Sequence, residues 1–468
     1  MNNQVNRQQD WLNSMNAGLR GFQTGRLGDA VAAFNQAVQI LPERVEGWVN
    51  LGSALLEARQ YDSAARALQK AVSVEPKFMA AHLTFGDALR QLGNVPKSIE
   101  SYRQAVALQK TVMGLNKLAC ALRITKEVAE AEALYREAIA MEPQFTLAQV
   151  NLATLLMEMS RFDEAGLSLG ALAKLNLPPA ERAEVTKSQQ VLSDYFLLKQ
   201  PLEVLVKEND RSSLEQALTS AHNRNRPVDE GVFKTIRKYA GATHDLSAYP
   251  TIALMDLPDE WPLIEALFMI PMVNTVSEYR ELRTKIHAGE KVAGDLLESL
   301  NMEPVTPAVR AARQELHDPI KAELHLRHWH ALASKDVEGM FPGHFKYTQN
   351  WNHKNPTMKR VEPALASSTF RHFISEIYAG FEPGIARAVI VWMTVCDLHA
   401  FADGNGRVAL SWLNRELEWA GLMPALFTKE MGVKGELAAA MKIVRNGSGD
   451  LSPVCDVIVK AQQHAVAF

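Results

Sequence analysis

The sequence predicts an all-α protein in which a helical repeat array is followed by a mostly helical domain with one small β-hairpin. The first 178 residues repeat at an interval of about 34 residues, which indicates stacked helical units. Apolar residues recur at helical spacing through most of the remaining chain. One stretch differs: FKYTQNWNHKNPTMKRVEP, residues 345–363, has aromatic and β-branched residues on both sides of a turn cluster, a pattern typical of a hairpin.

Length and composition are those of a multidomain globular protein. A chain of 468 residues favours two or three domains, and 47% apolar and 22% charged residues are ordinary values. The net charge of −3 argues against a polyanion-binding surface, so we expect no nucleic-acid partner. The three cysteines lie far apart without a CxxC pair, which suits a reducing compartment and predicts neither a disulfide framework nor a zinc site.

The apolar segments of the sequence do not favour a membrane location. The N-terminus, MNNQVNRQQD, is polar and lacks the apolar run of a signal peptide. No stretch reaches the roughly 18 uncharged apolar residues that a membrane span needs. The most apolar window, IARAVIVWMTVCDL, contains Arg387 and Asp397 and therefore predicts a buried helix at 385–398. We expect a cytoplasmic protein, with signal-independent secretion as the open alternative.

Small and bulky residues recur in register through residues 11–178. The recurring positions are Ala30, Phe34, Ala37 and Pro42; Ala64, Leu68, Ala71 and Pro76; Ser98, Tyr102 and Ala105; Ala131, Tyr135, Ala138 and Pro143; and a looser copy near Leu152 and Ala165. Small residues let two antiparallel helices approach, bulky ones fill the space between them, and proline marks the end of the second helix. The pattern resembles the tetratricopeptide repeat in about five copies, which implies a curved solenoid that binds a protein partner.

Residues 179–262 keep helical periodicity after the repeat has ended, with Pro250 and Pro258 marking loops. No residue pattern there indicates chemistry. We expect a helical connector over 179–262 and a third, functional domain over 263–460.

The nonapeptide HAFADGNGR, residues 399–407, separates the helix predicted at 385–398 from a second helix that Gly421 is placed to end. Gly404, Asn405 and Gly406 at a helix start would leave backbone N–H groups unpaired, and the helix dipole favours an anion there. Arg407 can bind phosphate oxygens, and Asp403 can hold Mg²⁺.

His399 and Phe401 complete this loop. His399 is largely neutral at pH 7 and can accept a proton from an attacking hydroxyl. Phe401, between polar residues, is best explained as an anchor that pins the loop to the core. D-G-N-G alone is a common turn, but base, metal ligand, anion site and cation within nine residues predict a phosphoryl- or nucleotidyl-transfer site.

The loop is similar to the signature of the Fic family, H-x-F-x-(D/E)-G-N-G-R-x-x-R, and the resemblance covers roughly residues 265–450. It implies transfer of a nucleotide monophosphate, typically AMP from ATP, to a Ser, Thr or Tyr hydroxyl of a target protein (AMPylation). By this resemblance His399 is the base, Asp403 binds Mg²⁺, and Gly404, Asn405, Gly406 and Arg407 hold the phosphates. The hairpin at 345–361 would pair with the target's backbone, and the repeats would recruit the target.

The chain departs from this signature at its last position. Leu410 stands where the family has its second arginine, and losing a charge-assisted contact costs about 1.5–3 kcal/mol of phosphate binding. The donor therefore stays open between ATP and another nucleoside triphosphate. Alternatives are UMP or phosphocholine transfer, removal of AMP from a target, and a catalytically decayed repeat scaffold.

Two smaller patterns remain. Ser334 to Gly339 fits the family's self-inhibitory motif, (S/T)-x-x-x-E-(G/N), but lies inside the segment matched to the domain core. A cluster of histidines offers a rival metal site, although no cysteine or carboxylate completes a known ligand spacing. Its members are His325, His328, His330, His344 and His353.

Overall fold

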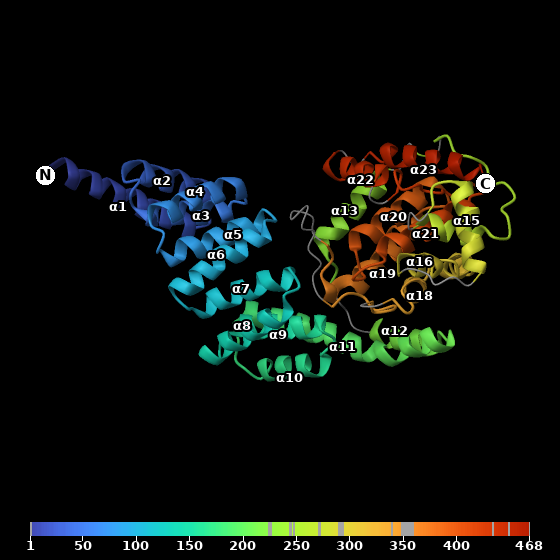
Figure 1. Ribbon diagram of the computed structural model, residues 1–468, viewed down its shortest axis with the longest axis horizontal. Coiled ribbons are helices and arrows are strands. Elements are labelled where there is room, and N and C mark those ends of the chain that lie inside the picture. The colour runs from blue at the N-terminus through green and yellow to red at the C-terminus, as the bar shows by residue number, and fades with distance from the viewer. Residues whose placement is uncertain are drawn as a thin grey trace. The chain divides into compact units, whose positions relative to one another are not determined.

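The computed structural model describes residues 2–467 except for 223–226, 243–245, 247–248, 270–272, 289–293, 338–339, 348–359, 433–434 and 448–449. The regular elements of these residues are α-helices and short 3₁₀-helices, with one isolated β-bridge between Ala253 and Leu422 (Figure 1). The predicted all-α class is therefore confirmed. Among the described helices, none combines the length and apolar character that crossing a bilayer requires. The described residues form two compact units, and the boundary between them in the chain is near residue 189.

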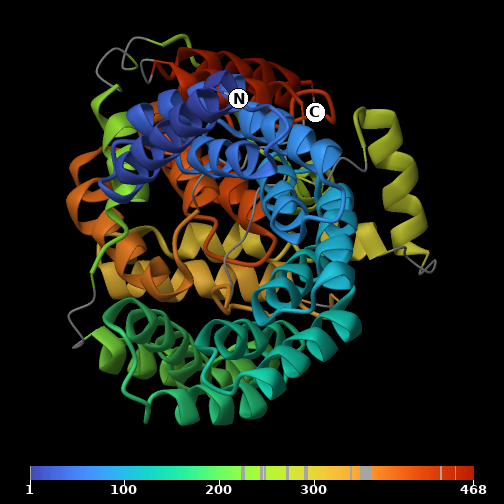
Figure 2. The ribbon, with the colours of Figure 1, turned by 90° about the vertical axis from the view of Figure 1, so that its left-hand side faces the viewer.

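The first unit consists of consecutive helix pairs that follow one another along an arc (Figure 2). Its helices are α1 (Asn2–Gln23), α2 (Leu27–Ile40), α3 (Val45–Glu57), α4 (Tyr61–Val74), α5 (Met79–Gln91), α6 (Val95–Leu108), α7 (Val112–Ile124), α8 (Val128–Met141), α9 (Thr146–Glu158) and α10 (Phe162–Leu172).

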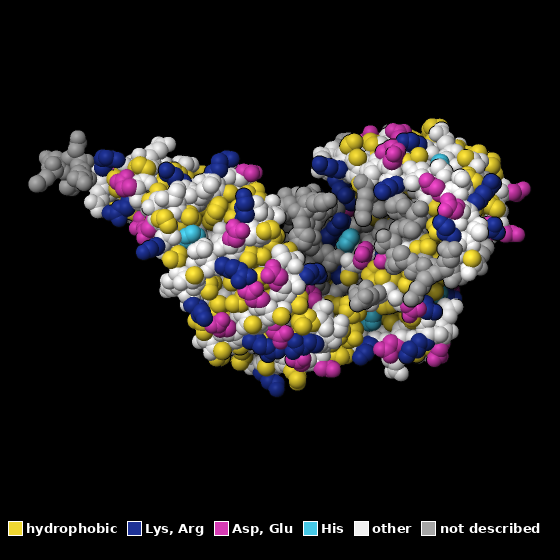
Figure 3. All heavy atoms as spheres, viewed as in Figure 1, with side chains coloured by type: hydrophobic (Ala, Val, Ile, Leu, Met, Phe, Trp, Pro, Cys, Tyr) yellow, Lys and Arg dark blue, Asp and Glu magenta, His cyan; other side chains and the backbone are white. Residues whose placement is uncertain are grey.

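Glycine permits the close contact within these pairs. A Cβ atom at Gly86 on α5 would lie 2.5 Å from the Tyr102 ring of α6, and one at Gly52 on α3 would lie 2.4 Å from Leu68 of α4. Basic and acidic side chains are interspersed on the face shown in Figure 3, and several pair between neighbouring repeats, as Lys110 does with Glu137 at 2.6 Å.

The second unit contains the predicted transfer site. Its helices are α11 (Pro179–Glu208), which begins before the boundary, α12 (Ser212–His222), α13 (Glu230–Gly241), α14 (Trp261–Met269), α15 (Val276–His287), α16 (Gly294–Leu300), α17 (Val305–Ala311), η2 (Arg313–Glu315), α18 (Pro319–Ala333), η3 (Pro363–Leu365), α19 (Ala366–Glu376), η4 (Tyr378–Gly380), α20 (Ile385–Leu398), α21 (Asn405–Trp419), α22 (Glu436–Asn446) and α23 (Ser452–Ala465). Helices α20 and α21 lie at its centre, where Trp392 and Trp412 are fully buried. The helix predicted over 385–398 is observed with those bounds.

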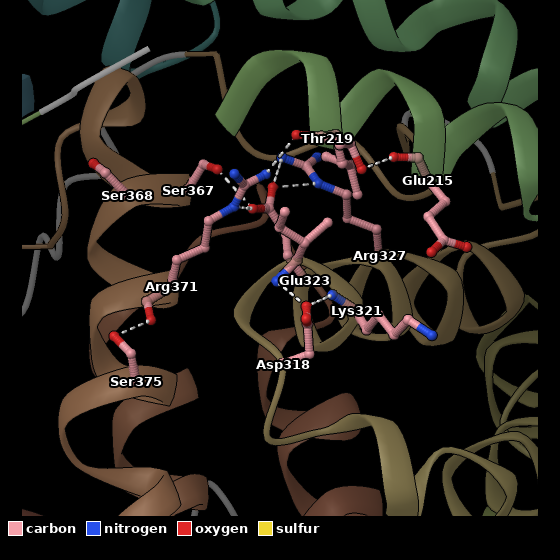
Figure 4. A network of polar contacts seen from close by, with 12 residues as sticks. Glu215, Thr219, Asp318, Lys321, Glu323, Arg327, Ser367, Ser368, Arg371 and Ser375 are labelled. Atoms are coloured by element: carbon pink, nitrogen blue, oxygen red, sulfur yellow. Dashed lines mark hydrogen bonds and ion pairs between the residues drawn. The ribbon is translucent and has the colours of Figure 1, made fainter. Parts of the chain in front are cut away.

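A buried ion-pair network fixes α18 against α19. Glu323, which is fully buried, accepts hydrogen bonds from Arg327 on its own helix (2.7 Å) and from Arg371 on α19 (2.5 Å), as Figure 4 shows. Ser367 donates a third hydrogen bond to Glu323. Two guanidinium groups around one carboxylate lower the pKa of Glu323 to about 2 despite its burial. The carboxylate therefore stays ionised, and α18 is held in a fixed place beside α19.

The hairpin predicted for residues 345–361 falls mostly on 348–359, which lie outside the described residues. Its flanking residues do not form strands, but both bond to the loop region. The backbone N–H of Lys346 donates to the carbonyl of Ala400 (2.7 Å), and that of Val361 donates to the carbonyl of Leu398 (3.3 Å). Both ends of the segment are thus held beside His399.

Candidate active site

The nonapeptide forms the turn between α20 and α21. His399 ends α20 in the left-handed conformation, with φ 47° and ψ 51°, a conformation that non-glycine residues adopt uncommonly and histidine more readily than most. Gly404, at φ 77°, is the N-cap residue of α21, which begins at Asn405, and as a glycine it gives the first N–H groups of that helix no side-chain hydrogen bond. The predicted base and the predicted anion site therefore lie at the adjoining ends of two consecutive helices, where the dipole of α21 favours negative charge.

Phe401 and Asn405 hold the loop in place. Phe401 is fully buried, and its ring stacks on the ring of His330 with centroids 3.8 Å apart. The side chain of Asn405 accepts a hydrogen bond from the N–H of Phe401 (3.0 Å) and donates one to its carbonyl (2.9 Å). Asn405 thus uses its amide group within the loop, so only its backbone N–H is available to a phosphate.

His330 on α18 joins three parts of the site. Its Nδ1 accepts the N–H of Gly343 (3.0 Å), and its Nε2 donates to the carbonyl of Asp403 (3.1 Å). These bonds fix one neutral tautomer, and burial lowers the pKa of His330 to about 3. The sequence indicated His330 only as one histidine of a candidate metal site. Among the described residues, no group of three or more His, Cys, Asp and Glu side chains is arranged to hold a metal.

The ring of His399 is partly buried and surrounded by cations. Burial is the main cause that lowers its pKa to about 3, and the charges of Arg360 and Lys346 lower it further. A backbone interaction with Cys396 raises the pKa of His399 but does not offset this lowering. His399 is therefore neutral at pH 7, as a general base must be before it acts.

Asp403 is exposed at the tip of the loop. Its Oδ1 accepts the N–H of Gly404 at 2.6 Å. An exposed carboxylate beside uncapped N–H groups fits Mg²⁺, which proteins commonly hold through one or two carboxylates, the phosphates of the substrate and water.

Arg407 and Leu410 face different surroundings on α21. The Nη1 of Arg407 lies 2.7 Å from Oε2 of Glu298 on α16, an ion pair that lacks hydrogen-bond alignment. Leu410 is 2% exposed and belongs to the apolar core. The self-inhibitory match at Ser334–Gly339 cannot be placed because residues 338–339 lie outside the described residues. Glu298, which no sequence pattern indicated, is thus the carboxylate that contacts an arginine of the loop.

Comparison with known families finds matches for two parts of the chain. Residues 320–417 match the Fic/DOC family, and residues 49–111 and 114–141 match tetratricopeptide repeats. The chain joins tetratricopeptide repeats to a Fic/DOC domain. The Fic/DOC match contains all but the first residue of α18, the whole of α19, α20 and the loop, and most of α21. Lys346 and Val361, whose backbone N–H groups bond on either side of His399, lie within it. The match supports a transferase of the Fic family, and the repeats support protein–protein interaction.

Solved structures similar to the chain include tetratricopeptide-repeat proteins. A MamA protein is 20% identical, with 36% of this chain and 98% of that chain covered and a TM-score of 0.33. A thermophilic repeat protein of Thermus thermophilus is 17% identical, with 38% and 97% covered and a TM-score of 0.34. Pseudomonas aeruginosa pilF is 13% identical, with 46% and 91% covered and a TM-score of 0.36. A comparison with curated proteins found no match.

Proposed function

We propose that this chain transfers a nucleotide monophosphate from a nucleoside triphosphate to a hydroxyl of a target protein, and that its repeats recruit the target. The observation that carries the proposal is the turn between α20 and α21, because it brings a neutral histidine and uncapped helix N–H groups together within one loop. A site with these parts suits chemistry in which a hydroxyl loses a proton while it attacks a phosphorus atom.

In the proposed reaction, a ring nitrogen of the neutral His399 takes the hydroxyl proton as the oxygen attacks the α-phosphorus. The bond to the β-phosphate oxygen breaks, and pyrophosphate leaves. The first N–H groups of α21 and the Arg407 guanidinium bind the phosphate oxygens and stabilise the charge that grows on them. Asp403 would hold Mg²⁺, which neutralises phosphate charge when bound. The negative donor also offsets the cations around His399 and raises its proton affinity at the moment it acts.

The donor is proposed as ATP, with another nucleoside triphosphate or CDP-choline as the second candidate. Leu410 favours CDP-choline, because this position is filled by the apolar core and supplies no cation to a γ-phosphate, which every nucleoside triphosphate carries and CDP-choline lacks. A donor that relies less on a distal contact would lose less binding energy at this site.

The test is transfer of label to protein. Purified protein and cell lysate are incubated with Mg²⁺ and with ATP, UTP, GTP or CTP labelled at the α-phosphate, or with CDP-choline labelled in its phosphocholine group. We expect one donor to label protein and His399→Ala to reduce the label at least about 10²-fold, the usual contribution of a general base. His372→Ala, which removes a more exposed histidine on α19, is the matched control. Absence of label with every donor, or full labelling by His399→Ala, would contradict the proposal.

A further inference from the structure

Lys346 is a buried cation beside the loop that the proposed reaction does not use. Its backbone N–H donates to the carbonyl of Ala400, the residue after His399, at 2.7 Å. The residue is 3% exposed, and its Nζ has no hydrogen-bond acceptor among the described residues. A buried ammonium group normally has a carboxylate or carbonyl partner because desolvating an unpaired charge is costly.

The carboxylates around Lys346 are engaged elsewhere. Asp229 accepts the backbone N–H groups of Val232 and Glu362, both at 3.2 Å. Asp397 accepts a hydrogen bond from the hydroxyl of Tyr239 (2.5 Å) and is paired with Arg360 and Arg445. Asp194, on the wall of the pocket that Lys346 lines, interacts with Arg327.

Residues 343–361, on either side of Lys346, contain no carboxylate that could pair with it. Residues 348–359, TQNWNHKNPTMK, contain two lysines and no Asp or Glu. The whole segment from Gly343 to Val361 therefore carries Lys346, Lys354, Lys359 and Arg360 without one carboxylate. Of the four cations, Lys346 and Arg360 lie in the described part of the chain, and the charges of both act on His399. Two cations beside a desolvated loop favour an anionic ligand there.

We propose that Lys346 is a further ligand-binding residue of the transfer site and that its ammonium group contacts a phosphate oxygen of the donor. The inference rests on the proposed function and deepens it, because Lys346 would supply the donor with a cation that Leu410, in the place of the family's second arginine, does not provide. Arg360 is a poorer candidate, since its guanidinium is already hydrogen bonded to the carbonyl of Cys396 and paired with Asp397. A phosphate bound at Lys346 would also lie beside His399, whose proton affinity it would raise.

Binding of inorganic pyrophosphate with Mg²⁺, measured by calorimetry on the full chain, tests the inference without requiring turnover. We expect Lys346→Met to weaken binding at least about 10-fold, the effect of one charge-assisted contact, and Lys346→Arg to stay within about 3-fold of wild type. Lys442→Met, which removes an exposed lysine on α22, is the matched control. Lys346→Met should also unfold at a higher temperature than wild type without ligand, because it removes an unpaired buried charge.

The pH dependence adds a second readout. Burial is the main cause that lowers the pKa of Lys346 to about 7, so the amine loses its proton, and with it the attraction for an anion, as pH rises from 6 to 8.5. Dividing the wild-type affinity by that of Lys346→Arg at each pH cancels the titration of the ligand, and we expect this ratio to fall. The charges of Arg360 and Asp229 act on Lys346, and that of Lys346 acts on His399. The other titratable and charged residues of the pocket that Lys346 lines are Asp194, Tyr195, Arg327, His344 and Tyr347.

The outcomes separate the two proposals. Wild-type affinity in Lys346→Met, or reduced affinity accompanied by a lower unfolding temperature, would overturn the inference in favour of a structural lysine. In another outcome, Lys346→Met loses pyrophosphate binding while wild type transfers no label from any donor. This result would support an anion site at Lys346 and contradict the proposed function. Transfer of label by wild type, together with unchanged pyrophosphate binding by Lys346→Met, would support the proposed function and contradict the role of Lys346.

Discussion

At the scale of single residues, Arg407 is available to a phosphate only if it gives up its present partner. Its guanidinium is paired with Glu298, and both side chains are largely shielded from water, at 11% and 29% exposed. A carboxylate and a phosphate compete for the same charged fork. The pair therefore lowers the affinity for the donor in the state that the structure shows.

Glu298→Gln should release Arg407 and tighten donor binding by about 3- to 10-fold, a part of the energy of one charge-assisted hydrogen bond because the pair is partly exposed to solvent. Titration of wild type and Glu298→Gln with pyrophosphate and with each nucleoside triphosphate measures this change. Glu303→Gln, an exposed carboxylate just beyond α16, controls for a general change in charge. Equal affinities of Glu298→Gln and wild type would show that the pair does not restrict the site.

At the scale of elements, side chains of α18 hold the loop at residues 399–407 in position. Arg327 donates to the carbonyl of Gly343 (3.0 Å) and lies over the Phe345 ring, while Glu323 holds Arg327 in turn. One turn further, His330 binds the N–H of Gly343 and the carbonyl of Asp403. The proposed metal ligand is thus positioned from a helix more than 70 residues earlier in the chain.

His330→Phe tests whether the hydrogen bonds of α18 position the loop, because phenylalanine keeps the stacking on Phe401 but makes neither hydrogen bond. Two buried polar groups would lose their partner, so we expect the free energy of unfolding to fall by about 2–4 kcal/mol. Mg²⁺-dependent donor binding should fall as well, since Asp403 would no longer be fixed. Urea unfolding and calorimetry measure both effects, with His372→Phe on α19 as the control. A variant with unchanged stability and binding would show that stacking alone positions the loop.

Sequence patterns predicted the helices and the loop of the site better than the residues that hold them in position. Local signals predicted three features of the site. Apolar periodicity predicted the helix at 385–398, a turn cluster predicted the loop, and a glycine, Gly421, predicted the end of α21, where it adopts a positive φ. The roles of His330, Glu298 and Lys346 depend on partners that are distant in the chain, and spacing carries no information on them. His330 was visible only as one of several histidines, and its true partners are two backbone groups.

At the scale of the whole molecule, the histidines are distributed unequally between the two units. Of the thirteen histidines, only His82 lies in residues 1–189. In the second unit, burial lowers the pKa of seven of them: His317, His325, His328, His330, His344, His399 and His464. The second unit therefore buries many neutral imidazoles that the unfolded chain would protonate.

The sign of the resulting pH dependence follows from linkage. The folded pKa is about 3 for His330, His344 and His399, whereas an unfolded histidine has a pKa of about 6.5. Between these values the unfolded state binds more protons, so the stabilisation is fully present above pH 6.5 and is lost as pH falls toward 3. Each such histidine contributes a slope of up to about 1.4 kcal/mol per pH unit.

We therefore expect the second unit to lose stability between pH 7.5 and 5.5 much more steeply than the repeat unit. Hydrogen-exchange mass spectrometry in moderate urea resolves peptides of both units in the intact chain, after correction for the pH dependence of intrinsic exchange. Peptides from α18 to α21 should lose protection at pH 5.5, while peptides from α2 to α8 should keep most of theirs. His344→Phe should make the second unit's dependence shallower by about one proton, because one titrating group is removed. Equal losses in both units would contradict the assignment of the acid sensitivity to these buried histidines.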